Sequence, residues 1–178
     1  NRYEGGEDAW GLVKKLEPPD PAGGAAFGTA VLLDGDRAYV SAPGEPWLVL
    51  PVGAVHVFER HMGGADNWGH KQRIVPDTVQ PGLAFGTFIA AEEELLLVNA
   101  PGYDEAGDDG APGLGALIGF VRDSASLFHE TRFVRGDALV DQVSVRPCVS
   151  SWLAVFADQV VHASYFGALS FPAPPFAE

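Results

Sequence analysis

Histidines are the side chains best suited to move a proton or bind a transition metal at neutral pH. None of the five belongs to an HExxH motif or to a pair at metal-ligand spacing, so the sequence does not support a zinc site. The serines lack a GxSxG elbow, which leaves no nucleophilic triad in view. The sequence therefore offers no catalytic residues among its histidines, which are His56, His61, His70, His129 and His162.

One aromatic residue stands in a setting typical of recognition. Trp47 lies in the proline-bounded loop GEPWLVLP, residues 44–51. An aromatic side chain in a loop can stack on a sugar or anchor a protein partner, and it can equally cap the edge of a sheet. Both interpretations of Trp47 stay open.

Composition excludes several classes of partner. The chain has 178 residues, and 24 acidic against 11 basic side chains give a formal charge of -13. That field repels phosphate backbones, so nucleic acid is not expected as a partner. No run of eighteen apolar residues is present, so we expect no direct insertion into a membrane. Cys148 is the single cysteine, which excludes an intrachain disulfide framework.

The chain contains an internal repeat that must organise its fold. The segment AFGTAVLLDGDRAYVSAP at residues 26–43 returns as AFGTFIAAEEELLLVNAP at residues 84–101, an offset of 58 residues. Each copy predicts two strands joined by an acidic turn. The nearly continuous apolar runs 26–33 and 84–91 predict inner strands covered on both faces. The motif residues shared by the two copies are Phe27, Gly28, Ala42, Pro43, Phe85, Gly86, Ala100 and Pro101.

Further strands flank each copy. Apolar and basic residues alternate in 10–16 and 68–75, which begin at Trp10 and Trp68 and predict outer strands wet on one face. Third strands begin at Gly53 and Gly115. A third, degenerate copy is predicted to use residues 128–134, 143–149, 152–157 and 167–171.

This order of motifs resembles the FG-GAP repeat of integrin α-subunit heads, strongly over residues 10–122 and weakly over 128–171. The resemblance implies an all-β fold made of β-propeller blades, about three four-stranded antiparallel repeats. The FG strand would be innermost and the Trp strand outermost. The repeats would span approximately 10–67, 68–126 and 127–178 of a single propeller segment, residues 1–178.

Three repeats are fewer than the four to eight blades of a closed propeller. We therefore expect the rest of a longer chain, or other chains, to supply further blades. An open fan with exposed edges is the alternative.

The resemblance also implies calcium, which family members often bind through a DxDxDG loop. The acidic loop of this chain, residues 102–113, departs from that spacing, so a solvated loop is the preferred interpretation. Asp104 and Asp108 are retained as candidate calcium ligands, and no other cofactor is expected. The candidate partner-binding residues are Trp47, Tyr103, Asp104, Glu105, Asp108 and Asp109.

The function expected is a non-enzymatic recognition or assembly module that binds protein or carbohydrate through the loops after the Ala-Pro pairs. An accessory propeller of a larger lyase or hydrolase is one alternative, and a structural subunit of a multiprotein complex is another. The family resemblance favours a secreted or cell-surface location.

Overall fold

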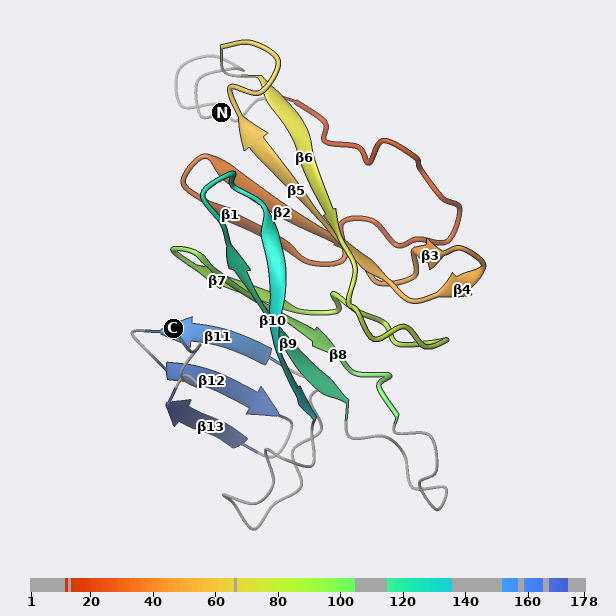
Figure 1. Cartoon of the computed structure of the whole chain (residues 1–178), viewed down its shortest axis with the longest axis vertical. Coiled ribbons are helices and arrows are strands. Elements are labelled where there is room, and N and C mark those ends of the chain that lie inside the picture. The colour runs from red at the N-terminus through yellow and green to blue at the C-terminus, as the bar shows by residue number, and fades with distance from the viewer. Residues whose placement is uncertain are drawn as a thin grey trace.

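The computed structural model describes residues 12, 14–65, 67–104, 115–135, 152–156, 159–164 and 167–172, and their regular structure is entirely β-strand. The first four-stranded sheet, called the first blade, has the order β1-β2-β5-β6. The second blade has the order β7-β8-β9-β10, and a third sheet has the order β11-β12-β13 (Figure 1). A small hairpin, β3–β4, projects from the first blade.

The strands of the first blade are β1 (Val31–Asp34), β2 (Arg37–Ala42), β5 (Ala54–Arg60) and β6 (Trp68–Ile74), with β3 (Pro46–Trp47) and β4 (Leu50–Pro51) in the hairpin. Those of the second blade are β7 (Ile89–Glu92), β8 (Leu95–Ala100), β9 (Ala116–Arg122) and β10 (Phe128–Arg135). The third sheet contains β11 (Trp152–Phe156), β12 (Gln159–Ser164) and β13 (Gly167–Pro172).

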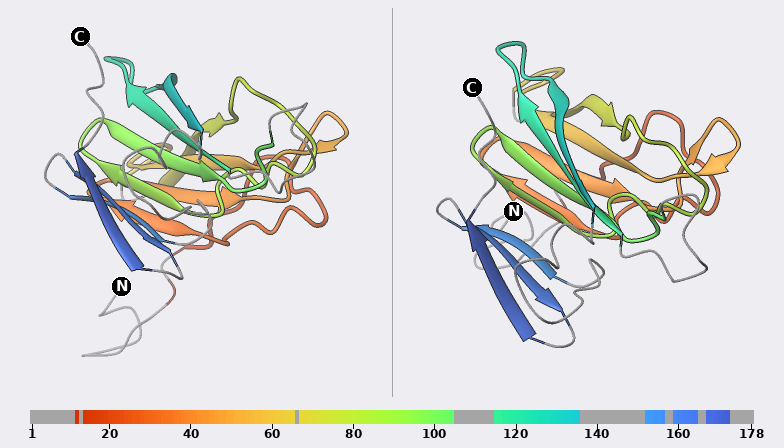
Figure 2. Two further views of the ribbon diagram at one scale, coloured as in Figure 1. Left: turned by 90° about the horizontal axis from the view of Figure 1, so that it is seen from below. Right: turned by 60° about the horizontal axis from the view of Figure 1, so that its bottom comes forward.

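In both blades each strand pairs antiparallel with its neighbour. The strand that follows the Phe-Gly pair, β1 or β7, lies at one edge, and the strand that begins at Trp68 or Phe128, β6 or β10, lies at the other. The inner strand β7 contacts both β1 and β11, so the first strands of the three sheets lie side by side (Figure 2). This arrangement confirms the prediction of an all-β fold made of propeller blades.

The main core lies between the faces of the first and second blades. A four-stranded sheet cannot bury both faces alone, and here each blade covers one face of its neighbour. Tyr39, Val55 and Val57 of the first blade meet Leu96, Val98 and Ile118 of the second in one buried cluster. Gly53 allows the two blades to approach closely, because a Cβ there would lie 2.3 Å from the carbonyl oxygen of Phe85.

The FG segments form turns, which corrects the prediction that strands begin at residues 26 and 84. Ala26 and Ala84 have positive φ values of 54° and 52°, and the following glycines Gly28 and Gly86 have 93° and 90°. The turns close when the amides of residues 29 and 87 donate to the carbonyls of residues 26 and 84. The strands begin only at Val31 and Ile89 because this turn conformation is incompatible with a ladder.

The same motif is buried to different degrees in its two copies. Phe85 is fully buried and packs edge-to-face on Phe120, whereas Phe27 is only half-buried against a smaller cluster. A Cβ at Gly86 would meet Ser41, Ala54 and Val55 of the first blade, and a Cβ at Gly28 would meet nothing within 4 Å. Within the described part of the chain, the first blade therefore packs against another blade on one face only.

Three further predictions about strands were wrong. Val31 and Leu33 of β1 are each 65% exposed, so this inner strand is not covered on both faces, because no blade among the described residues lies over that side. Residues 14–16 form no strand, and the ammonium of Lys14 instead donates to the Trp68 carbonyl at 2.7 Å. In the third sheet β11 takes the inner place next to β7, and β12 was not predicted.

One correction of detail concerns the third unit. Residues 128–134 belong to β10, which completes the second blade by pairing with β9. Residues 143–149 and Cys148 lie outside the described residues. Within the described residues, no helix is long and apolar enough to cross a membrane.

Candidate functional site

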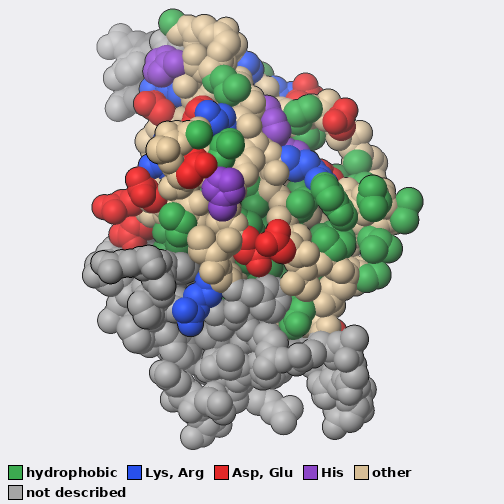
Figure 3. Space-filling view, in the orientation of Figure 1, with side chains coloured by type: hydrophobic (Ala, Val, Ile, Leu, Met, Phe, Trp, Pro, Cys, Tyr) green, Lys and Arg blue, Asp and Glu red, His purple; other side chains and the backbone are tan. Residues whose placement is uncertain are grey.

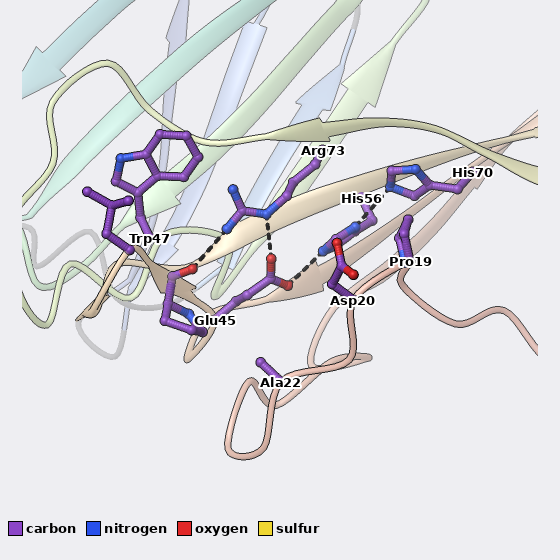
Figure 4. A pocket seen from close by; sticks show the side chains of 10 residues that line it. Pro19, Asp20, Ala22, Glu45, Trp47, His56, His70 and Arg73 are labelled. Atoms are coloured by element: carbon purple, nitrogen blue, oxygen red, sulfur yellow. Dashed lines mark hydrogen bonds and ion pairs between the residues drawn. The ribbon is translucent and has the colours of Figure 1, made fainter.

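A cluster of charged and titratable side chains lies on the first blade, beside the β3–β4 hairpin. Glu45 follows the Ala42-Pro43 pair, and its backbone carbonyl accepts hydrogen bonds from the amides of Val52 and Gly53 at 3.3 and 2.9 Å. His56 lies on β5, and His70 and Arg73 lie on β6. Figure 4 shows the four side chains pointing toward one another.

A β-bulge in β6 brings His70 and Arg73 to the same face. Residues three apart on a regular strand point to opposite faces. The register between β5 and β6 shifts between Val57 and Phe58, so that Arg73 lies opposite His56 while His70 lies opposite Phe58. The extra residue of the bulge restores both side chains to the His56 side.

The cluster is one chain of hydrogen bonds. His56 Nε2 lies 2.7 Å from Glu45 Oε2, and His56 Nδ1 lies 3.0 Å from His70 Nε2. The other oxygen of Glu45 accepts a hydrogen bond from Arg73 Nε, and Arg73 Nη2 donates to the Pro46 carbonyl at 3.1 Å. His56 is 1% exposed and Glu45 6%, so these two groups depend on their partners for solvation.

The surroundings shift two of the pKa values in the cluster. Burial by itself raises the pKa of Glu45, but hydrogen bonds from His56 and Arg73 outweigh it and hold this pKa below its ordinary value. Burial lowers the pKa of His70 and the neighbouring His56 lowers it further, against the opposing charge of Glu45. Glu45 is therefore the anion of the cluster, and His70 is held toward its neutral form.

A pocket of about 520 Å³ opens beside this chain of hydrogen bonds. Trp47 forms one wall, with the Arg73 guanidinium carbon 5.1 Å from its ring centroid, within the range of a cation–π contact. The remaining lining residues are Pro19, Asp20, Ala22, Glu45, Pro46, Leu48, His56 and His70 (Figure 4).

The second blade does not repeat the cluster. Glu45 corresponds to Tyr103, because both amides donate to the carbonyl of the preceding Ala-Pro alanine and both carbonyls accept from the following glycine. His56 corresponds to Ile118 and His70 to Glu130 by strand register. The blade fold therefore does not require these polar side chains, and of the first and second blades only the first carries the cluster.

The structure places three of the sequence-predicted site residues in different surroundings. Trp47 lines the pocket, whereas Tyr103 packs partly buried against the core between the blades. Asp104 is exposed, and its amide donates to the Gln80 side chain at 3.0 Å. Trp10, Glu105, Asp108 and Asp109 lie outside the described residues.

Among the described residues, no three His, Cys, Asp or Glu side chains are grouped so as to hold a metal ion. The calcium prediction at Asp104 and Asp108 thus stays a prediction. Sequence reasoning missed Glu45, His56, His70 and Arg73. The one available signal was a difference between the two copies, in which Tyr103 and Ile118 stand where Glu45 and His56 stand in the first.

Comparison with known proteins gives one family match. Residues 10–58 match the model of the FG-GAP repeat. The matched segment runs through β1, β2 and the hairpin into β5, and it ends at Phe58. No curated protein matches the chain.

Proposed function

Because the chain is an FG-GAP repeat protein, we propose that it is a non-enzymatic recognition module that binds a protein partner through the β3–β4 hairpin. This hairpin is the connection after the Ala42-Pro43 pair. Its tip carries Leu48 and Val49, which are 86% and 87% exposed, next to Trp47 at 39%. Figure 3 shows hydrophobic side chains gathered over this region of the surface.

The backbone of the tip supports the proposal most directly. Leu48 has a φ of 57°, a left-handed conformation that is costly for a branched, bulky residue. A two-residue hairpin turn ordinarily uses Asn or Gly there. A strained leucine that is 86% exposed gains little from folding, and a contact outside the chain would explain it.

The hairpin is also held in place before any partner arrives. Arg73 bonds the Pro46 carbonyl, and Glu45 accepts the amides of Val52 and Gly53. A pre-ordered loop loses little conformational entropy on binding, which favours affinity. The proposed setting is secreted or at the cell surface, as the sequence resemblance implies.

The alternative of an enzyme would place its catalytic site at the propeller centre. The position of the cluster formed by Glu45, His56 and His70 does not support that alternative. The cluster sits on the third and fourth strands of the first blade and on the loop beside them, whereas β1 is the inner strand. A role as a purely structural subunit would instead require that the apolar tip is covered permanently by another chain.

The test begins with a photo-crosslinking amino acid at position 48, which captures the partner for identification. The affinity of that purified partner is then measured calorimetrically for the native chain and for Leu48→Asn combined with Val49→Gly. Asn tolerates the left-handed conformation of residue 48 and Gly can adopt the conformation of residue 49, so we expect the fold to be retained while binding weakens about tenfold or more.

The matched control is Met62→Gln, which removes an apolar side chain that is 41% exposed in another turn. Unchanged affinity in the Asn-Gly variant would overturn the protein-binding proposal. Loss of binding in Trp47→Ala alone, with the Asn-Gly variant unaffected, would favour a carbohydrate that stacks on the indole ring.

A further inference from the structure

The two histidines of the cluster can hold one extra proton between them but not two. His56 Nε2–H donates to ionised Glu45, so its Nδ1 must either accept from His70 Nε2–H or donate to an unprotonated His70 Nε2. Both states keep the 3.0 Å hydrogen bond. If both rings are fully protonated, two N–H groups face each other and the bond must break.

Among the described residues, the groups that face the pair do not offset a second charge. On β6 the Arg73 guanidinium is a further cation, and Glu45 is already bonded to both Arg73 and His56. On the other sides the pair packs against the rings of Phe27 and Phe58, at centroid distances of 5.5 Å to His56 and 5.3 Å to His70. Asp20 lines the same pocket without an ion pair to either histidine among the described contacts.

We propose that the His56–His70 pair is an acid-responsive switch that loosens the β3–β4 hairpin when the second proton binds. The proposal rests on the proposed function for its biological meaning, since it assigns a regulator to the same hairpin. In mildly acidic surroundings the loosened hairpin would release its partner. The lowered pKa of His70 agrees with this direction, because the folded state resists its protonation.

Glu45 carries the change from the pair to the hairpin. Its side chain holds His56 and Arg73, and its backbone carbonyl holds the amides of Val52 and Gly53 that close the hairpin. When the two imidazolium rings repel, His56 moves away from His70 and the Glu45 carboxylate bonded to it moves as well. Glu45 then leaves the position in which its backbone carbonyl closes the hairpin.

The second blade provides an internal reference. Tyr103, Ile118 and Glu130 occupy the corresponding positions, so the second blade has no histidine pair to protonate. Any acid response of the switch should therefore appear in residues 44–53 and be absent from β8 and β9.

The test is amide hydrogen exchange of the whole chain between pH 7.5 and 5, corrected for the intrinsic pH dependence of exchange and made without any partner. We expect protection of residues 44–53 to fall by up to about tenfold per pH unit once the second proton binds, as linkage of one proton requires. Protection of those β8 amides that exchange while the first blade stays folded should change little over the same range.

Two variants separate the switch from general acid sensitivity. Gln in His70→Gln can still hydrogen-bond His56 but takes up no proton, so this variant should abolish the pH dependence. His129→Gln removes an exposed histidine bonded to Asp123 at 2.8 Å and should leave the dependence intact. Retained pH dependence in His70→Gln, or constant protection of the native hairpin, would overturn the proposal.

If His70→Gln does not fold, nitrogen NMR of the native histidine rings decides the question. The switch requires two coupled titration steps shared by His56 and His70. Independent single titrations would overturn it. A hairpin that opens in acid but binds no partner would refute the proposed function and leave the switch standing.

Discussion

The comparison of Gly86→Ala with Gly28→Ala tests whether blade packing, and not the FG turn itself, fixes the glycine of this motif. Both glycines have nearly the same backbone conformation, with φ values of 90° and 93°. An alanine at positive φ costs about 1–2 kcal/mol at either position. This backbone penalty is common to both variants and cancels in their difference.

The two sites differ in what the new methyl group meets. At Gly86 the added carbon would lie 3.1 Å from the Ser41 Cβ and 3.2 Å from the Ala54 carbonyl oxygen and the Val55 Cγ2, all in the first blade. At Gly28 nothing lies within 4 Å. Overpacking of a well-packed interior costs about 1–3 kcal/mol, so Gly86→Ala should lose that much more stability than Gly28→Ala.

The assay is urea denaturation of both variants and the native chain. Each transition is monitored with two spectroscopic probes, whose coincidence checks that unfolding is two-state. The midpoints should fall in the order native, Gly28→Ala, Gly86→Ala, with similar slopes. Equal losses in the two variants would refute the reasoning, because they would mean that the first and second blades do not approach as closely in solution as the structure shows.

Three further outcomes follow from burial and from the shifted pKa values. Phe85→Ala should lower the free energy of unfolding, measured by urea denaturation, by about 3–5 kcal/mol, and Phe27→Ala should lower it clearly less because Phe27 is only half-buried. A reversed order would contradict the single-sided packing of the first blade. Tyr39→Phe should leave stability unchanged or raise it by up to about 1 kcal/mol, because the buried Tyr39 hydroxyl has no hydrogen-bond partner among the described residues. A loss of stability by more than about 1 kcal/mol would show that the hydroxyl has a partner. The lowered pKa of His70 means that the unfolded chain binds more protons below its ordinary value of 6.5, so stability should decline as pH falls from there, with a second decline below 4.5 from Glu45. Thermal unfolding should be measured across pH for the native chain and for His70→Gln. The decline in stability that begins near pH 6.5 should appear in the native chain alone, and its persistence in the variant would contradict its assignment to His70.

The repeat and its strands could be predicted from the sequence because they depend on local patterns. Alternating apolar residues, acidic turns and Ala-Pro stops recur at fixed offsets, and β2, β5, β8 and β9 lie where those patterns place them. The stacking of blades followed from the same information, since a four-stranded unit with two apolar faces must cover them. The third sheet was predicted less well, because its copy has lost the motif residues that set the register.

The candidate site could not be predicted, because its members come together only through register. Residue spacing puts His70 and Arg73 on opposite faces of a regular strand, and the bulge in β6 that reverses this has no clear mark in the sequence. His56 and Glu45 meet because β5 returns beside the loop after Pro43. Trp47 was identified by its setting in the sequence, but its contact with Arg73 was not.

The sequence by itself therefore determined a repeat of short antiparallel strands, because periodicity and turn residues act over a few neighbours, and the resemblance of its motifs implied that these repeats are propeller blades. Only the tertiary structure decided that Phe85 is buried while the identical Phe27 is half-exposed, since burial depends on whether another blade lies over that face. The same holds for the Glu45–His56–His70 chain, whose hydrogen bonds need the bulge, the hairpin and the strand pairing at once.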